Sequence, residues 1–258
     1  MPFELSVNLE YMFHEAGERL EDRMAAAAAA GFRKVEIFTT ANRDVPSLKA
    51  ALAETGCELL ATVTDPRIAL VMADQHARFR EMFAQAAAEA AELGATNIVV
   101  PSGIAVPYMK RPAQLDVVAG AIASVVETAA ANGLTILLEP VNTRIDHPGV
   151  LFSMTEDAVG VIERIGSPQV KLLYDLYHSI TEREDPRAVL PEVAHLVGHI
   201  QIADAPGRGE PGAGQIDWSA MLKLIESVGY TGPLGLELTP TGPDTAEALA
   251  HIRALAAA

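Results

Sequence analysis

Basic residues and cysteines are scarce in this chain of 258 residues. Lysine and arginine total 19 against 34 aspartate and glutamate residues, and the formal net charge is −15. Such a chain repels nucleic-acid backbones and anionic membranes, so neither is an expected partner. Cys57 is the only cysteine, which excludes an internal disulfide framework and fits a reducing cytoplasm.

Long apolar runs and targeting signals are also missing. No uninterrupted apolar run reaches the roughly 18 residues that a membrane span requires. The N-terminal residues M-P-F-E-L-S-V-N lack the basic segment and apolar core of a secretory signal. We therefore expect a cytoplasmic protein. Hydrophobic residues make up 50% of the chain, which is enough for a large core.

A strand-like run followed by an Ala/Leu-rich amphipathic stretch repeats along the chain without a linker. The expected strands are Phe3–Asn8, Lys34–Phe38, Glu58–Thr62, Asn97–Pro101, Thr135–Glu139, Val170–Asp175, Val197–Ile202 and Pro233–Glu237. The expected helices are Gly17–Ala30, Pro46–Thr55, Gln75–Leu93, Pro112–Ala131, Thr155–Ile165, Pro186–His195, Trp218–Val228 and Thr245–Ala256. Strict alternation implies a parallel sheet, and eight units favour a single (β/α)8 TIM barrel over residues 1–258. An open doubly wound sheet is the alternative, but no G-x-G-x-x-G follows the first strand.

Glycine and proline mark the ends of the expected helices. A glycine follows six of them, where a left-handed C-terminal cap is favoured: Gly31, Gly56, Gly94, Gly133, Gly166 and Gly229. A proline stands at the start of three, where its missing N–H costs little: Pro46, Pro112 and Pro186. These residues support the expected helix limits.

An acceptor side chain closes each of the last four expected strands: Glu139, Asp175, Gln201 and Glu237. Parallel barrel strands end at one rim, where the catalytic residues of such barrels lie. Three carboxylates and an amide oxygen converging there form a site for a hard divalent metal, Mg²⁺ or Mn²⁺, without the Cys and His ligands that select zinc. Helix capping or water binding would explain one such residue, but not four on consecutive strands.

Side-chain alternation separates an inner from an outer face of these strands. Counting back by twos from the four acceptors assigns mostly small and polar residues to the inner face and bulky aliphatic residues to the outer face. His199 lies one inward position below Gln201, so we expect it to support a ligand rather than to bind the metal. Glu36 also points inward, and Lys171 is an expected partner for an interior acid, because buried charges must be matched.

The two glutamates lie on the fifth and eighth strands, which are not neighbours. Glu139 and Glu237 would therefore approach a substrate from opposite sides. The metal would polarise the carbonyl of a small hydroxy-carbonyl compound and stabilise the enediolate formed on proton removal. One glutamate takes the proton, and the other returns it at the neighbouring carbon or on the other face. Such a pair serves isomerisation or epimerisation, whereas hydrolysis needs a positioned water and redox chemistry a nucleotide site.

Two cationic or titratable side chains near these strand ends are candidates for substrate binding. His178 follows Asp175 by three residues and can bond a substrate oxygen, although a solvated loop histidine is an equal alternative. Arg208 is the one cation in the glycine-rich loop after the seventh strand, and a guanidinium can bind a carboxylate bidentately. An exposed ion pair with Glu210 is the alternative for Arg208.

Four motifs resemble the hydroxypyruvate isomerase family of the xylose-isomerase-like barrels: L-L-E-P-V-N, L-Y-D-L-Y-H, H-I-Q-I-A-D-A-P-G-R-G-E-P-G-A-G-Q-I-D-W and G-L-E-L. The phrases N-L-E-Y-M-F and G-F-R-K-V-E-I-F are similar too, so the likeness covers nearly the whole chain. The glutamine at position 201 matters, because the related ketose 3-epimerases usually carry histidine there.

This resemblance implies a metal bound by Glu139, Asp175, Gln201 and Glu237, with the two glutamates as the acid/base pair. It implies substrate contacts from His178 and Arg208, and the conversion of hydroxypyruvate to tartronate semialdehyde or an analogous keto–aldose reaction. It also implies a homo-oligomer. The segment Val63–Asp74 is shorter than in typical members, which predicts a more open site or a different ligand, with Asp65 and Arg67 as compensating residues.

Several other functions are compatible with the same scaffold. A ketose or keto-acid 3-epimerase shares the proton-transfer machinery, and a metal-dependent lyase or dehydratase of cyclitols is a further alternative. An endonuclease is disfavoured, because it calls for a basic groove and more histidine ligands. A non-catalytic barrel that binds metal as a subunit or sensor is the alternative outside enzymes.

Overall fold

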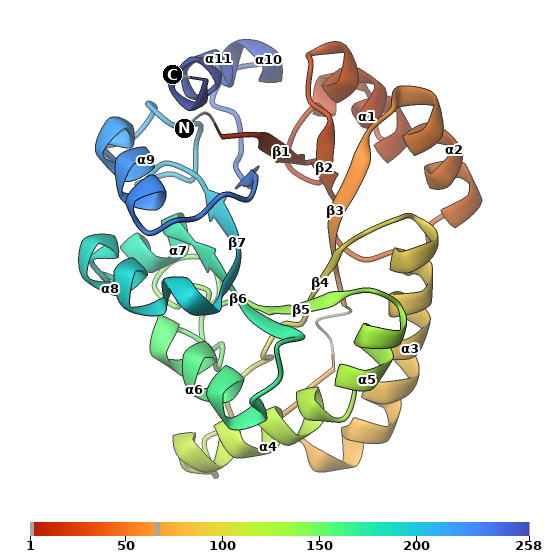
Figure 1. Cartoon of the computed structure of the whole chain (residues 1–258), viewed down its shortest axis with the longest axis vertical. Helices are drawn as coiled ribbons and strands as arrows, with labels where there is room; N and C mark the ends of the chain where they lie inside the picture. The colour runs from red at the N-terminus through yellow and green to blue at the C-terminus, as the bar shows by residue number, and fades with distance from the viewer. Residues whose placement is uncertain (1–2, 65–67, 258) are drawn as a thin grey trace.

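Eight parallel strands form a closed barrel with helices around it (Figure 1). The computed structural model describes residues 3–64 and 68–257. Each strand pairs with the next one in the sequence, and β8 pairs with β1. The two ends of the chain lie beside each other, where the Phe3 amide donates to the Ala256 carbonyl at 2.7 Å. The prediction of a (β/α)8 barrel is confirmed, and the open-sheet alternative is wrong.

All eight predicted strands are present, with limits within two residues of those expected. They are β1 (Leu5–Asn8), β2 (Lys34–Glu36), β3 (Glu58–Val63), β4 (Asn97–Val99), β5 (Thr135–Leu138), β6 (Val170–Asp175), β7 (Val197–Ile202) and β8 (Leu234–Leu236). Several strands end one or two residues before their predicted limit, because the chain there leaves the hydrogen-bonded sheet and enters the rim loops. Glu139 and Glu237 are therefore the first residues after β5 and β8.

The helices of the outer layer follow the predicted order with three differences. They are α1 (Leu20–Ala29), α2 (Val45–Thr55), α3 (His76–Glu92), α4 (Arg111–Ala123), α5 (Val126–Ala131), α6 (Thr155–Ile165), α7 (Leu176–Thr181), α8 (Pro186–Val193), α9 (Trp218–Ser227), α10 (Thr245–Ala248) and α11 (Ala250–Ala256), with 3₁₀ turns at His14–Ala16, Ala73–Gln75 and Ala194–Leu196. Two predicted helices, Pro112–Ala131 and Thr245–Ala256, are each divided in two. Helix α7 was not predicted.

The glycines and prolines lie where they were predicted to mark helix ends. All six glycines have positive φ, between 64° at Gly166 and 93° at Gly31. Prolines occupy the first turn of α2, α4 and α8. The break between α4 and α5 falls at Ser124, whose hydroxyl donates to the Ala121 carbonyl at 2.6 Å in competition with the helical ladder.

The apolar core has two parts. The larger part lies between the strands and the helices. A small cluster of Val99, Leu137 and Leu173, with Val63 against it, is separate from the larger core. Its members belong to β3–β6 and alternate with the residues that face the helices, so it fills the barrel interior beneath the carboxyl ends of the strands. The polar rim is therefore built on a packed floor.

One stretch, Arg111–Ala131, is long and apolar enough to cross a membrane by length and composition alone. In the structure it is not one helix but α4 followed by α5. Helix α4 packs against α6, and α5 packs against α3 and β5. The apolar residues of this stretch therefore belong to the outer layer of the barrel.

Candidate functional site

The four predicted acceptor residues lie at one rim of the barrel, on or just after β5–β8. Asp175 is paired in register with Gln201, and Gln201 with Gly235. Asp175, Gln201 and Glu237 are buried to 3%, 3% and 8% relative exposure. The Glu139 side chain is 16% exposed. The strand ends thus bring together the oxygen-rich set that the sequence predicted.

Three of these residues have an oxygen atom without a hydrogen-bond partner in the described part of the chain: Glu139 Oε1, Asp175 Oδ2 and Gln201 Oε1. All three atoms are buried. A buried acceptor without a donor carries a substantial desolvation cost. Buried oxygens without a partner at the ends of three consecutive strands are therefore suited to bind a ligand that is a cation or a hydrogen-bond donor.

Asp175 also explains the helix that the sequence did not predict. Its Oδ1 accepts hydrogen bonds from the backbone amides of Tyr177 (2.8 Å) and His178 (3.2 Å) and so caps α7. An aspartate just before a helix is a common N-cap signal, and it was available in the sequence. One oxygen caps the helix while the other stays free, so capping and ligand binding are compatible in this carboxylate.

Glu237 differs from the other three acceptors because both of its oxygens have partners. Its Oε1 accepts from Arg208 Nη2 at 2.6 Å, and its Oε2 accepts from Asn8 Nδ2 at 3.0 Å and Gln201 Nε2 at 2.9 Å. Glu237 Oε1 has a single donor and so keeps one acceptor position for a metal. Its assignment as a ligand stays a prediction.

Arg208 lies inside the rim and not on the surface. It is 9% exposed, and its guanidinium carbon lies 5.2 Å from the ring centroids of both Tyr11 and Tyr177. Glu210, its alternative partner, instead binds Thr241. The exposed ion pair between Arg208 and Glu210 is therefore wrong. Arg208 Nε is buried without an acceptor among the described residues, which makes it a free donor beside the acids.

The carboxyl groups of this rim have altered proton affinities. Burial, followed by the charges of Glu237 and Asp175, raises the pKa of Glu139 well above its usual value. Burial raises the pKa of Glu237 to about 7, although the charge of Arg208 opposes the shift. Burial likewise raises the pKa of Asp175. All three shifts favour the protonated form of the carboxyl group, and burial is the first cause of each.

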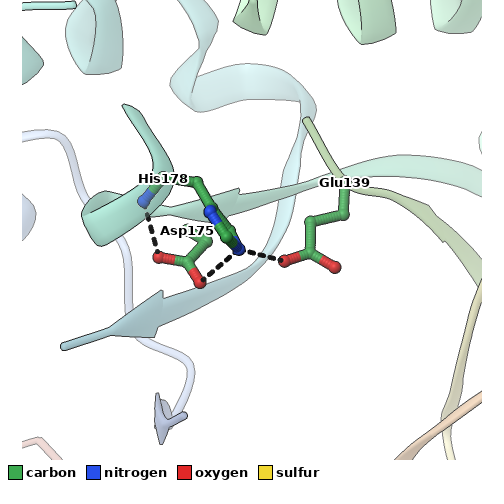
Figure 2. Close-up of side chains that lie close together, drawn as sticks. All are labelled: Glu139, Asp175 and His178. Atoms are coloured by element: carbon green, nitrogen blue, oxygen red, sulfur yellow. Dashed lines mark hydrogen bonds and ion pairs between the residues drawn. The ribbon is translucent and has the colours of Figure 1, made fainter. Parts of the chain in front are cut away.

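His178 projects between Asp175 and Glu139 (Figure 2). Its Nε2 lies 3.7 Å from Asp175 Oδ2 and 3.9 Å from Glu139 Oε1. These three residues offer ligand atoms within 4.8 Å of one another, so together they form a candidate metal-binding cluster. The alternative of a solvated loop histidine is wrong, because His178 is 2% exposed.

The hydrogen bonds of His178 favour a donor role over metal ligation. Its Nδ1 lies 3.3 Å from the Asn142 backbone N–H, which can only donate, and 2.7 Å from Asn142 Nδ2. Burial and the charges of Arg208 and His147 hold the pKa of His178 well below its usual value. A neutral imidazole with an accepting Nδ1 carries its proton on Nε2. His178 therefore presents an N–H to the space between the two carboxylates.

His199 and Glu36 form a buried pair beneath Gln201. His199 Nε2 lies 3.0 Å from Glu36 Oε1, and Gln201 Nε2 donates to Glu36 Oε2 at 2.9 Å. His199 therefore reaches the predicted ligand through Glu36 and not directly. Glu36 is bound by Ser6, His199 and Gln201, so Lys171 was the wrong partner to expect for it.

The loop after β7 is organised by Asp204, which the sequence reasoning did not single out. Asp204 is fully buried. Its Oδ1 accepts from the amides of Ala205 and Ile216, and its Oδ2 accepts from the Gly212 amide and the Trp218 indole N–H, at 2.7–3.1 Å. The loop closed by these bonds carries Arg208. An aspartate before a glycine-rich loop was the available signal, but its partners are visible only in three dimensions.

We expect Asp204→Asn to loosen this loop and to lower activity about tenfold or more. The amide nitrogen would face two of the donors that now bind Asp204, and leaving a buried donor such as the Trp218 indole unsatisfied costs about 1–3 kcal/mol. Trp218 is the only tryptophan, so its fluorescence reports directly on the loop. A red-shifted emission with reduced kcat/KM is the expected result. Wild-type emission and kinetics in the variant would contradict this role of Asp204.

The acids open into a cavity of about 480 Å³ between the rim loops. Glu139, Glu237, Gln201, His178 and His147 line one part of it. Apolar side chains from β2–β5 and the loops after them line another part: Ile37, Phe38, Val63, Val99, Ile104, Val141 and Val150. Further polar lining residues are Asn8, Tyr11, Glu36, Thr39, Thr64 and Ser102. No lysine or arginine is among its described lining residues. Asp65 and Arg67, the predicted compensating residues, lie outside the described residues.

Comparisons with known proteins agree with this geometry. The sequence model of the xylose isomerase-like TIM barrel family matches residues 24–255. Hydroxypyruvate isomerase of Escherichia coli is 31% identical over 254 residues, covering 91% of this chain and 93% of the relative. The 2-oxo-tetronate isomerase of Cupriavidus necator is 30% identical over 242 residues, covering 91% and 92%. The crystal structure of an AP endonuclease, family 2, from Brucella melitensis superposes with a TM-score of 0.90 at 28% identity, covering 98% of both chains.

Proposed function

Because the chain belongs to the xylose isomerase-like TIM barrel family, we propose that it is a divalent-metal-dependent isomerase of a small hydroxy-keto acid. The proposed reaction interconverts the keto acid and its aldehyde isomer, with hydroxypyruvate and tartronate semialdehyde, or a 2-oxo-tetronate pair, as substrates. The names of its relatives support the isomerase class. We propose that the reaction takes place in the cytoplasm, in keeping with the single cysteine.

The observation that carries this proposal is the set of orphaned buried oxygens on Glu139, Asp175 and Gln201. Oxygen ligands of this kind suit Mg²⁺ or Mn²⁺. These three residues, with the remaining acceptor position of Glu237 Oε1, would hold the ion. When bound, the metal supplies Lewis-acid polarisation of the substrate carbonyl. The donor set contains no thiolate, which disfavours a softer metal.

The two glutamates supply the proton transfer. Glu139 and Glu237 line the same cavity from β5 and β8, which lie on different sides of the barrel. Carboxyl groups act as general acids and bases in transfers of this kind, and burial raises the pKa of both glutamates in the metal-free protein. One carboxylate removes the proton from the hydroxyl-bearing carbon, and the other delivers a proton to the former carbonyl carbon. The proton of the substrate hydroxyl moves to the former carbonyl oxygen, so that the hydroxyl-bearing carbon becomes the aldehyde. Their roles exchange in the reverse direction.

His178 and Arg208 provide the donors that orient the substrate. The Nε2–H of His178 faces the space between Asp175 and Glu139, where it can donate to a substrate oxygen. Arg208 Nε is a buried donor without an acceptor in the described part of the chain, and the carboxylate of a keto acid is a matching acceptor.

A panel of substrates tests this proposal: hydroxypyruvate, tartronate semialdehyde, 2-oxo- and 3-oxo-tetronates and free ketoses, each with added Mn²⁺. We expect the highest kcat/KM for a hydroxy-keto acid, with an aldehyde as product. Deuterium incorporation from solvent at C3 of a ketose, without aldose formation, would identify a 3-epimerase instead. Lack of turnover across the panel would support a non-catalytic metal-binding barrel.

A further inference from the structure

The amide of Gln201 is held in one orientation by two carboxylates. Its Nε2 donates to Glu36 Oε2 at 2.9 Å and to Glu237 Oε2 at 2.9 Å. Both amide hydrogens are therefore used. Rotation of the amide by 180° would place its oxygen against two acceptors, which is unfavourable. The carbonyl oxygen is consequently the free end of the side chain, and it is one of the orphaned buried atoms.

Glu36 is itself fixed by donors on its other oxygen. Its Oε1 accepts from Ser6 Oγ at 2.5 Å and lies 3.0 Å from His199 Nε2. Glu36 is 2% exposed. The carboxylate therefore has one oxygen committed to Ser6 and His199 and the other committed to Gln201. This arrangement leaves Glu36 no freedom to turn away from the amide.

The neighbouring strand β8, on which Gly235 pairs in register with Gln201, leaves space for this network. A Cβ atom at Gly235 on β8 would lie 2.5 Å from Glu36 Oε1, 2.7 Å from His199 Nε2 and 2.9 Å from Gln201 Cγ. Real Cβ contacts are never this short, so any side chain at position 235 would displace Glu36, His199 or Gln201. A glycine at this barrel position is therefore required by the Glu36–His199–Gln201 network.

We propose that Glu36 is a positioning residue that aims the Gln201 carbonyl oxygen at the metal of the proposed site. Glu36 contacts neither metal nor substrate in this role and acts through the amide of Gln201. The inference rests on the proposed function, because it requires a metal bound at Glu139, Asp175 and Gln201. It also accounts for an amide at position 201, since only a side chain with both a donor and an acceptor end can bind Glu36 and a cation together.

Glu36→Gln tests the proposal because it keeps the shape of the side chain and replaces one acceptor oxygen with a donor. The new amide must keep its oxygen toward Ser6 and His199, so its nitrogen faces the nitrogen of Gln201. We expect Mn²⁺ affinity of the metal-free protein, measured by isothermal titration calorimetry, to fall about 10- to 100-fold, as for other residues that orient metal ligands. Unchanged Mn²⁺ affinity in the folded variant would overturn the inference.

Two further measurements keep the test decisive. If Glu36→Gln does not fold, Gly235→Ala displaces the same network without removing a charge, and its Mn²⁺ affinity should fall. In a crystal structure of the wild-type protein with Mn²⁺, we expect Gln201 Oε1 to coordinate the ion while Gln201 Nε2 still donates to Glu36. Coordination of Mn²⁺ without Gln201 would overturn this inference but leave the proposed function standing. Absence of Mn²⁺ binding by the wild-type protein would instead overturn the metal site on which the proposed function depends.

Discussion

Glu139→Gln is expected to lower kcat by at least ~10³-fold, the scale of a lost general acid or base. Glutamine retains the shape and one oxygen of the side chain but cannot exchange a proton. The assay requires saturating substrate and Mn²⁺, so that weaker binding of either does not limit the rate. Solvent-deuterium exchange into the substrate should fall in parallel, because this exchange requires the same proton transfer.

The same substitution should raise the melting temperature of the metal-free protein. In that state the pKa of Glu139 is raised by burial and by the charges of Glu237 and Asp175, so an ionised carboxylate at position 139 is unfavourable in the folded protein. Glutamine removes this unfavourable charge. Glu156→Gln, at an exposed position of α6, is a matched control and should change neither property. Full activity in Glu139→Gln would support the non-catalytic barrel.

Removing the divalent ion by exhaustive chelation should lower activity on the order of 10³-fold, since metal polarisation of a carbonyl contributes several kcal/mol and each 1.4 kcal/mol is a factor of ten. Addition of Mn²⁺ or Mg²⁺ should restore the rate, and the more effective ion identifies the physiological candidate. Elemental analysis of the chelated protein is the necessary control. Activity that persists in protein free of metal would exclude the ion from the mechanism.

The stability of the chelated protein should depend on pH through Glu237. Its folded-state pKa of about 7 exceeds the value of about 4.3 for an unfolded glutamate. A raised carboxyl pKa stabilises the folded state at low pH, and this contribution is lost as pH rises between the two values. Metal ions displace these protons. The increase in melting temperature caused by Mn²⁺ should therefore be larger at pH 8 than at pH 5.5; equal increases would show that the proton and the ion do not compete.

The succession of strands and helices in the barrel could be predicted from the sequence, because it depends on local signals. Runs of apolar residues with glycine and proline at helix ends define strands and helices one after another, and the strand limits agree within two residues. Parallel strands end at one rim, so the sequence also placed Glu139, Asp175, Gln201 and Glu237 together. Helix α7 was missed, because Asp175 was considered as a ligand and not also as an N-cap.

Donor–acceptor partnerships were beyond the reach of the sequence, because they join residues far apart along the chain. The pairing of Arg208 with Glu237 in place of Glu210, and of Glu36 with His199 in place of Lys171, follows from side chains that meet across the barrel. Periodicity specifies which face a side chain occupies, but distance and direction specify its partner. Residue identity alone was therefore sufficient for the fold and for the oxygen-rich rim, whereas three-dimensional packing determined which oxygens stay free to bind a ligand.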